Sequence, residues 1–518
     1  MAIHTVISSP NDLFDARVPH LLGAVLVMLT LLWYWIREER PIPGFPIANK
    51  VEGDWWFNSK AKNRLITDSN KILKEGFEKY KGKPFQILGE IGPMIVLSPE
   101  LANEIRNNAN LSFVHVTERA FLPQYKGLEP FGPGFNNNDI FQTTVRVNLT
   151  QSLGSITQAI SDETTYALGI LLPDVTKEWT SITWMPFATD LVSRISAKVF
   201  LGEPLCRNND WLHISVMYTV NSFNAARTLR SWPPFLRPLV HLLKPEFKEL
   251  QKQLADARRI INPEVEKRKR ARREAIAAGQ KPSKAADAIE WMLEQAKDQD
   301  YDVAMGQVML AIAAIHTTSG MLSALLWHLA AAPEYIDELR KEIAQVFTED
   351  GGFKKTSLYK MRLLDSCMKE AQRLHTISAN ALPRKALAPI TLSDGTRIPA
   401  GAFVSVPTWT MRDSYYYENP DNFDGRRYLE KRSQPGNEHR WQFVTTAPEH
   451  LGFGHGQHAC PGRFFASNEI KIAMTHLLMK YDWKFEGEPP LKSLRDSEWI
   501  PDPTAKIMLR AREAEIQF

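Results

Sequence analysis

Residues 307–331 form a long apolar stretch that ends shortly before Pro333. Apolar side chains recur on every face at helical spacing, which predicts a buried core helix rather than a surface helix. At about 1.5 Å per residue, this helix would cross a small domain. Polar residues 316–319 interrupt its middle. The pattern therefore predicts a core helix with polar side chains at its centre.

Most other segments also show helical periodicity, and an amphipathic helix is expected over 363–374. Residues 85–88 and 94–97 predict a hairpin, after which Ser98 and Pro99 open a helix. Three further short strands are expected from apolar and β-branched runs: 390–392, 402–406 and 505–509. No linker, repeat or low-complexity tract follows residue 50. The sequence predicts a mainly α fold with small β elements in a single large domain.

The apolar run over residues 18–36 is a separate element. As a helix it would cover about 28 Å, close to the core of a thin endoplasmic reticulum membrane, and aromatic residues mark its end. A cleaved signal peptide would need a positive start and small residues at the cut, which this run lacks. We therefore expect it to be a transmembrane helix.

Basic residues indicate the orientation of this anchor. Arg37, Arg40 and Lys50 follow the run, whereas only Arg17 precedes it, so the body should face the cytosol. The expected organisation is as follows: a short lumenal N-terminus at 1–17, a single-pass anchor at 18–36, a proline-rich hinge at 37–50 and a catalytic domain at 51–518.

Composition sets few limits on function. The 518 residues are 44% hydrophobic and 24% charged, an ordinary globular balance, and the net charge of +4 is small. The dense basic run at 267–273 lies in a polar helical stretch before a loop near 280–283, which is typical of a solvated face. It has no interleaved aromatic residues and no nucleic-acid-binding motif, so we expect no nucleic-acid partner.

The chain has three cysteines, an odd number without disulfide spacing, which favours a reducing compartment. Cys206 and Cys367 are expected to be packing residues. The glycosylation sequons at Asn110 and Asn148 should then remain unmodified, because the body does not enter the lumen.

Cys460 has a different setting, within a segment (453–463) that contains three glycines and runs into a helix. Glycine lets the backbone approach a bulky ligand, and a helix start directs N–H groups at the sulfur, which should lower its pKa. A thiolate suits a soft metal. Inert packing is the simple alternative, and a zinc site with His455 and His458 would need further ligands at short spacing.

The spacing Phe-x-x-Gly-x-x-x-Cys-x-Gly resembles the haem-binding loop of the cytochrome P-450 superfamily. The matching residues are Phe453, Gly456, Cys460 and Gly462. The resemblance implies haem b with the Cys460 thiolate as axial ligand, and Phe453 packed on the porphyrin near the sulfur. It also implies a membrane-anchored haem-thiolate monooxygenase.

Glu370 and Arg373 lie on one helix face at i, i+3 spacing. By itself such a pair is usually solvated and contributes little. In the resembled family this pair is buried and holds an arginine from a later segment, here Arg427 within 420–428. Loss of one member would leave an unpaired buried charge, at a cost of roughly 3 to 5 kcal/mol.

The central helix is similar to the distal helix of the same family. Thr317 matches the alcohol that assists proton delivery to dioxygen, whereas Ala314 replaces a glycine and His316 replaces an acid. His316 either relays protons, since its ordinary pKa is about 6.5, or faces a neighbouring helix while Thr317 holds a water. From the residues alone, hydroxyls bonded back to helix carbonyl groups are the favoured interpretation, and only the position of Thr317 in the family pattern favours a role in proton delivery. This variant is similar to fungal members of terpenoid and alkaloid secondary metabolism.

Three cations match family positions that face the haem propionates: Arg146, Arg384 and His458. Cations suit carboxylates, although each of these residues is otherwise interpreted as a surface or capping residue. Arg146 lies in 142–146, where the family's Trp-x-x-x-Arg pattern keeps its arginine and lacks its tryptophan.

The resemblance implies a lipophilic small-molecule substrate and electrons from an NADPH-cytochrome reductase or a cytochrome b-type donor, since the chain has no flavin or nicotinamide fingerprint. The pocket walls would come from 114–140, 313–317, 377–382 and 499–503. One alternative is a reductase-independent haem-thiolate isomerase or dehydratase, and another is a non-catalytic haem carrier or sensor.

Overall fold

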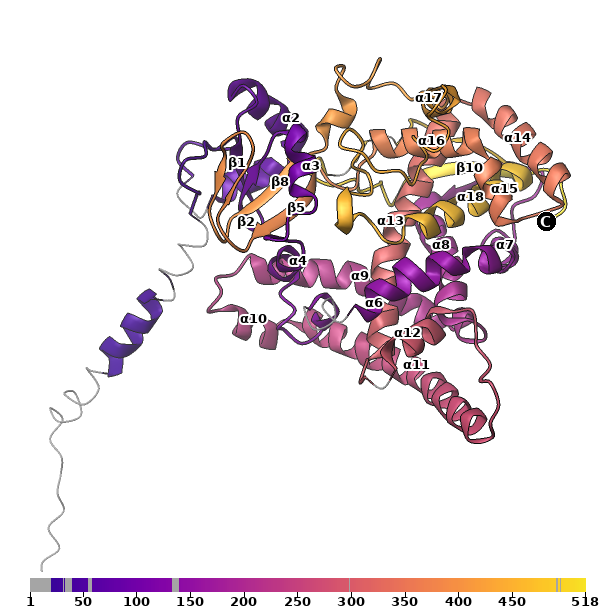
Figure 1. Ribbon diagram of the computed structural model, residues 1–518, viewed down its shortest axis with the longest axis horizontal. Helices are drawn as coiled ribbons and strands as arrows, with labels where there is room; N and C mark the ends of the chain where they lie inside the picture. Colours follow the sequence, from indigo (N-terminus) through magenta and orange to yellow (C-terminus); the bar gives the residue numbers. More distant parts are fainter. Residues whose placement is uncertain are drawn as a thin grey trace, which may run out of the picture.

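The computed structural model describes residues 20–30, 32, 40–54, 58–132, 139–297, 299–490, 492–493 and 495–518. Helix α13 (Val303–Ala331) crosses the body of the molecule (Figure 1). The predicted core helix is confirmed and begins four residues earlier than expected, because the Asp302 side chain accepts a hydrogen bond from the Met305 amide at 3.0 Å and caps the first turn.

Most of the other α-helices lie around α13, while α2 (Ser59–Lys79) and α3 (Ala102–Ile105) lie beside the sheet at one edge of the body (Figure 1). The remaining helices are α4 (Val114–Phe121), α6 (Ile140–Thr143), α7 (Thr150–Leu171), α8 (Trp184–Leu201), α9 (Asn209–Arg230), α10 (Arg237–Leu243), α11 (Pro245–Ala277), α12 (Ala288–Ala296), α14 (Glu334–Asp350), α15 (Lys355–Lys360), α16 (Arg362–Leu374), α17 (Arg427–Ser433) and α18 (Arg463–Lys480). The helix expected over 363–374 is confirmed as α16. The helix expected after Ser98 is confirmed only as a 3-10 turn (Pro99–Leu101) followed by the short α3.

A five-stranded sheet joins the N-terminal and C-terminal parts of the chain. Its order is β1 (Phe85–Gly89), β2 (Gly92–Val96), β8 (Phe403–Pro407), β5 (Asn380–Ala386) and β3 (Leu111–Ser112). The predicted hairpin is confirmed, with Phe85 opposite Val96, and β2 pairs in parallel with β8.

Two smaller sheets complete the β structure: β4 (Thr180–Thr183), β10 (Lys506–Ala511) and β9 (Tyr481–Phe485) form one, and β6 (Ile390–Thr391) and β7 (Arg397–Ile398) form the other. The three isolated strands that were predicted are confirmed as β6, β8 and β10. Strands β3, β4, β5, β7 and β9 were not predicted, because pairing with other segments rather than local propensity forms them. The mainly α single-domain fold is confirmed.

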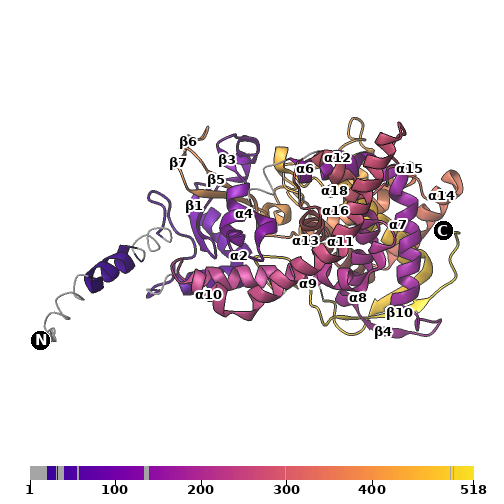
Figure 2. The same ribbon diagram turned by 90° about the horizontal axis from the view of Figure 1, so that it is seen from below.

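Residues 20–30 form an apolar helix whose leucines are exposed (Leu21 63%, Leu26 68%). It is shorter than the predicted anchor; residues 18–19, 31 and 33–36 of that anchor lie outside the described residues. Both views place this helix on the same side of the body as α10 (Figures 1 and 2). Among the described helices, α13 is the one with the length and composition to cross a membrane, but 67% of its apolar window is buried, as expected of a core helix.

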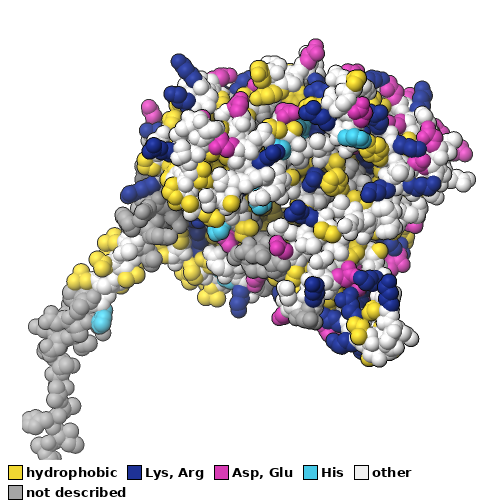
Figure 3. Space-filling model, in the orientation of Figure 1, with side chains coloured by type: hydrophobic (Ala, Val, Ile, Leu, Met, Phe, Trp, Pro, Cys, Tyr) yellow, Lys and Arg dark blue, Asp and Glu magenta, His cyan; other side chains and the backbone are white. Residues whose placement is uncertain are grey.

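The basic run at 267–273 lies on the projecting end of α11, where Lys and Arg side chains gather on the surface (Figure 3). Part of its charge is neutralised locally. Arg268 pairs with Asp287 at 2.6 Å, and Lys267 pairs with Glu264 at 3.1 Å. Most of the other basic residues are exposed, in agreement with a solvated face.

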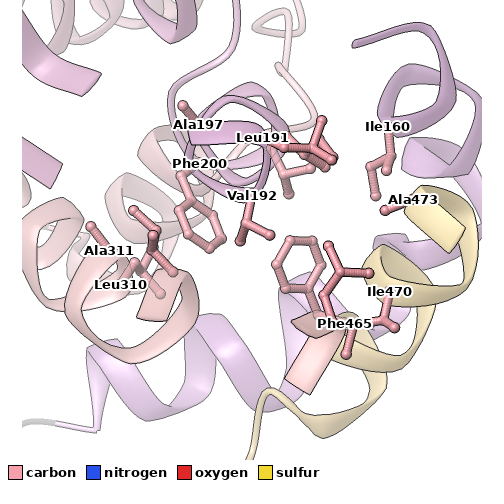
Figure 4. Close-up of a cluster of buried hydrophobic side chains, with 14 of the residues drawn as sticks. Ile160, Leu191, Val192, Ala197, Phe200, Leu310, Ala311, Phe465, Ile470 and Ala473 are labelled. Atoms are coloured by element: carbon pink, nitrogen blue, oxygen red, sulfur yellow. The ribbon is translucent and has the colours of Figure 1, made fainter. Parts of the chain in front are cut away.

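The main apolar core lies where α7, α8, α13 and α18 meet (Figure 4). Phe200 of α8 and Phe465 of α18 are both buried, with ring centroids 5.5 Å apart. Leu310 of α13 belongs to the same cluster. This packing fixes α18, and therefore the loop that precedes it, relative to the central helix.

Candidate active site

The loop before α18 holds Cys460 in a compact turn. The Cys460 amide donates to the Phe453 carbonyl oxygen at 2.8 Å, and Gly454 and Gly456 have φ angles of 69° and 81°. A Cβ on Gly456 would lie 2.6 Å from Asn107 Oδ1, so no larger residue fits without a shift. The glycines are therefore needed both for the turn and for the close approach of the chain.

The sulfur of Cys460 accepts hydrogen bonds from the backbone amides of Gly462 and Arg463, as expected for a helix start. Burial nevertheless raises the pKa of the Cys460 thiol above its ordinary value, and these amides and the Arg463 charge offset it only in part. The expectation of a lowered pKa is wrong for the protein alone, because desolvation outweighs the local dipoles. A bound metal cation would stabilise the thiolate directly.

Phe453 packs edge-on against Phe443, with centroids 5.0 Å apart. Gly462 caps α18, and a Cβ there would lie 3.9 Å from Val145. Within the described part of the chain, no group of three or more His, Cys, Asp or Glu side chains is arranged to hold a metal ion. A haem iron needs only one protein ligand.

The three predicted cations lie around this loop. Arg384 is buried (2% exposed), while His458 and Arg146 are exposed. Partial desolvation lowers the pKa of His458, and the charges of Arg384 and Arg146 lower it further. The ring of Phe113 lies between two of these groups, with its centroid 6.5 Å from that of His458 and 5.8 Å from the Arg384 guanidinium. Arg146 lies in a π-helical segment, Thr144–Leu149, a feature frequent at functional sites.

Arg384 is a buried cation with no carboxylate partner among the described residues. Its Nη1 donates to the Pro383 carbonyl oxygen at 2.8 Å and its guanidinium lies 5.8 Å from the centre of the Phe113 ring, but in this part of the chain Nε and Nη2 have no hydrogen-bond partner. Burial lowers its pKa to about 10. A register shift in β5 and a positive φ of 51° at Leu382 precede this side chain. Because uncompensated buried charges are costly, this site fits a carboxylate ligand such as a haem propionate.

The predicted ionic cluster forms. Glu370 and Arg373 are fully buried and joined at 2.7 Å, and Arg427 Nε lies 3.1 Å from Glu370 Oε1. Arg373 also donates to the carbonyl oxygens of Met411 (2.7 Å) and Pro420 (2.5 Å). The cluster therefore fixes the chain that leads into the Cys460 loop.

The sequence interpretation missed a second buried ionic network on α16. Asp365 accepts from Lys471 at 2.7 Å and Arg432 at 3.1 Å, and from the Phe443 amide at 2.9 Å. It thereby links α16, α17 and α18 behind the loop, and holds the segment on which Phe453 packs. The one sequence signal was a carboxylate among the apolar residues of this helix.

The structure shows two different orientations in the middle of α13. Thr317 and Ala313, one turn apart, are exposed although the helix around them is buried. The Thr317 hydroxyl donates to the Ala313 carbonyl oxygen at 2.8 Å. This is the hydrogen bond back to the helix that the residues alone predicted. His316 instead faces α9, with Nε2 3.0 Å from the Val216 carbonyl oxygen.

Two of the predicted pocket walls are joined to each other. The Ala379 amide donates to the Ser497 carbonyl oxygen at 3.0 Å, and the Trp499 amide donates to the Ile377 carbonyl oxygen at 3.2 Å. Ile377 is 51% exposed. Residues 133–138 of a third predicted wall lie outside the described residues.

Glu469, nine residues after Cys460, is fully buried on α18. It accepts a hydrogen bond from the Ser196 hydroxyl at 2.7 Å, and its second oxygen has no partner within the described part of the chain. Burial raises the pKa of Glu469 from 4.5 to about 8, so the folded protein keeps this proton at neutral pH. The unfolded chain releases it above its ordinary pKa. Folding stability from this group is therefore complete at low pH and is lost as the pH rises towards 8.

Glu469→Gln is expected to remove this loss, because the amide stays neutral and keeps an acceptor for Ser196. The free energy of unfolding should rise at pH 8 by on the order of 3 kcal/mol and change little at pH 5. Urea unfolding at the two pH values measures this difference. An equal effect at both pH values would show that Glu469 does not bind a proton on folding.

Comparisons with known proteins agree with this architecture. Residues 55–511 match the family model described as "Cytochrome P450". The chain is 42% identical over 473 residues to "Cytochrome P450 monooxygenase hepE" of Aspergillus oryzae, which covers 90% of this chain and 84% of that protein. It is 38% identical over 480 residues to "Cytochrome P450 monooxygenase TRI1" of Fusarium sporotrichioides, which covers 92% and 87%.

A solved structure has the same fold. The chain described as "Retinoic acid bound cyanobacterial CYP120A1" superposes with a TM-score of 0.64 over 87% of this chain and 96% of that one, at 18% identity. Proteins of this family carry haem b with a cysteine thiolate as the axial ligand. The family match across most of the chain and the similarity to fungal monooxygenases show that this protein belongs to the cytochrome P450 family of haem-thiolate monooxygenases.

Proposed function

We propose that this protein is a membrane-anchored monooxygenase that oxidises a lipophilic small molecule, by hydroxylation or a related reaction, in fungal terpenoid or alkaloid secondary metabolism. It uses O2 and electrons from NADPH, delivered by a separate reductase or a cytochrome b-type donor. The observation that carries the proposal is the buried Arg384, whose Nε and Nη2 have no hydrogen-bond partner among the described residues, near the glycine-shaped Cys460 loop. The fungal origin of the similar monooxygenases supports the biological setting.

The proposal assigns a haem-binding role to each residue around the loop. Cys460 would hold the haem iron through its sulfur, Gly456 and Gly462 would let the loop approach the porphyrin, and Phe453 would pack on it. Arg384, His458 and Arg146 would hold the propionates. Bound haem with a thiolate ligand supplies the electron-rich iron that favours O–O cleavage.

Thr317 manages protons in this proposal. Its hydroxyl donates to the Ala313 carbonyl oxygen, which leaves the oxygen lone pairs free to accept a hydrogen bond from a water on the exposed side of α13. Proton delivery then runs through that water.

Thr317→Ala is expected to uncouple the reaction, because the water loses its acceptor. NADPH consumption should continue, while product per NADPH falls several-fold and hydrogen peroxide rises. Thr317→Ser retains the hydroxyl and should recover most of the coupling. Product, peroxide and NADPH are measured in one reductase-supported assay, and equal coupling in all three proteins would contradict this role.

The same assay separates the proposal from its alternatives. A monooxygenase requires both NADPH and reductase for turnover. A haem-thiolate isomerase or dehydratase would convert its substrate without either. A carrier or sensor would bind haem and give no product in any condition. The candidate substrate is found by comparing metabolites of the source organism before and after deletion of the gene.

The proposed location is the endoplasmic reticulum membrane, with residues 1–17 in the lumen, 18–36 as a single-pass anchor, 37–50 as a hinge and 51–518 in the cytosol. The exposed apolar helix at 20–30 supports the anchor. On the same side of the body, α10 presents Leu239, Leu242 and Leu243, which are 53%, 68% and 69% exposed (Figures 1 and 2). An apolar patch of this kind suits the membrane surface.

Deletion of residues 1–50 is expected to convert the protein from an integral to a peripheral one that still binds phosphatidylcholine vesicles through α10. Changing Leu239, Leu242 and Leu243 to serine in the deleted protein should then lower vesicle binding at least tenfold, since three apolar side chains no longer enter the lipid. Ile276→Ser, at a 62% exposed position on α11, is the control. Flotation with vesicles measures binding, and unchanged binding of the serine variant would contradict the role of α10.

A further inference from the structure

His316 connects the middle of α13 to the middle of α9. Its Nε2 lies 3.0 Å from the carbonyl oxygen of Val216. A carbonyl oxygen only accepts, so this ring nitrogen carries a proton and donates it. Burial lowers the pKa of His316, and the hydrogen bond to Val216 offsets this only in part. The imidazole is therefore neutral at neutral pH and has a fixed tautomer.

The face of α9 that receives this bond continues as an apolar stripe, defined as Val216, Val220 and Phe223. These residues are spaced at i, i+4 and i+7 and share one helix face. Val220 and Phe223 are each 39% exposed. The ring of Phe223 meets that of Phe121 from α4 edge-on, with centroids 4.8 Å apart. The stripe therefore contacts α4 through Phe223 and leaves Val220 and Phe223 partly exposed, as apolar side chains that a lipophilic ligand can cover.

We propose that His316 is a positioning residue that holds this stripe of α9 at a fixed distance from α13 and so selects for bulky lipophilic substrates that reach α9. This inference rests on the proposed monooxygenase function. The binding of small ligands that contact only the haem does not depend on the hydrogen bond between His316 and Val216.

A proton relay through this ring does not fit the same geometry. The Nε2 proton is committed to a helix carbonyl oxygen, whereas a relay must release a proton towards the reacting atoms. Successive residues point about 100° apart around a helix, so His316 and Thr317 face different directions. The acid of the family pattern is thus replaced here by a group that makes a structural contact.

The test uses the full-length ferric haem protein and two probes that bind haem iron through an imidazole nitrogen. Imidazole itself is small, whereas clotrimazole carries a bulky triphenylmethyl group. Optical titration gives Kd for each probe with the wild type, His316→Leu, His316→Gln and, as a matched control, His213→Leu. His213 is an exposed histidine on α9.

His316→Leu should bind imidazole within twofold of the wild type and bind clotrimazole about three- to tenfold more weakly, the effect of losing one net hydrogen bond. His316→Gln should restore clotrimazole binding, because its amide N–H can donate to the same carbonyl oxygen. His213→Leu should match the wild type. If His316→Leu fails to bind haem, His316→Met replaces it with the same expectation.

Equal clotrimazole Kd values in all the proteins would overturn the proposal. So would a His316→Gln protein as weak as His316→Leu, because the donor would then be irrelevant. The titrations need neither NADPH nor reductase, whereas failure of the proposed function appears as a lack of NADPH-dependent turnover in the wild type. The two failures are therefore distinguishable.

Discussion

Replacing Cys460 with alanine is expected to abolish the haem-thiolate spectrum and all monooxygenase turnover while the protein stays folded. The methyl group offers no ligand to iron, whereas the sulfur of Cys460 accepts hydrogen bonds from the amides of Gly462 and Arg463 at the start of α18. The core around Phe465 begins beyond the loop and does not depend on the sulfur. The absorption spectrum of the reduced, carbon-monoxide-bound protein measures thiolate ligation through its red-shifted Soret band.

The other two cysteines provide matched controls. Cys206 and Cys367 are buried thiols with raised pKa values, which burial causes in both cases. Alanine at either position should keep the red-shifted band, with at most a modest loss of stability. Circular dichroism monitors folding in all three variants. A normal band in the Cys460→Ala protein, or loss of the band in either control alone, would contradict the assignment of the axial ligand.

Glu370→Gln is expected to destabilise the protein by about 3 to 5 kcal/mol, because Arg373 and Arg427 lose their shared carboxylate. The side chains of Glu370 and Arg373 are both 0% exposed, so water cannot solvate the arginine charge that loses its carboxylate partner. Urea unfolding of the haem-loaded protein measures the change. Haem retention should fall as well, since Arg373 also holds the carbonyl groups of Met411 and Pro420 on the path to the Cys460 loop.

An exposed ion pair in the same region is the control. Arg412 and Asp421 are joined at 2.6 Å, but their side chains are 50% and 71% exposed. Asp421→Asn should therefore cost less than about 1 kcal/mol and leave haem binding unchanged. If Glu370→Gln and Asp421→Asn lowered the free energy of unfolding by similar amounts, burial would not be the reason that the cluster stabilises the protein.

The sequence predicted the fold and the Cys460 loop but not the buried ionic network of Asp365. Local sequence patterns predicted the apolar helix α13, the hairpin of β1 and β2 and the loop around Cys460, because each of these features depends on residues that are close together in the chain. Asp365 was missed, although it lies on the same helix as Glu370. Its partners Arg432 and Lys471 are 67 and 106 positions further along the chain, and no local spacing signals their contact with it.

The sequence by itself determined the mainly helical architecture and the thiol in a glycine-shaped loop, since each depends on periodicity or short spacing. It placed Glu370 and Arg373 on one helix face, but only the family resemblance implied that this pair is buried. Tertiary structure alone decided the direction of His316, the uncompensated burial of Arg384 and the raised pKa of the Cys460 thiol. The physical reason is that helix phase, desolvation and long-range charges depend on what packs against a side chain, and those neighbours come from distant parts of the chain.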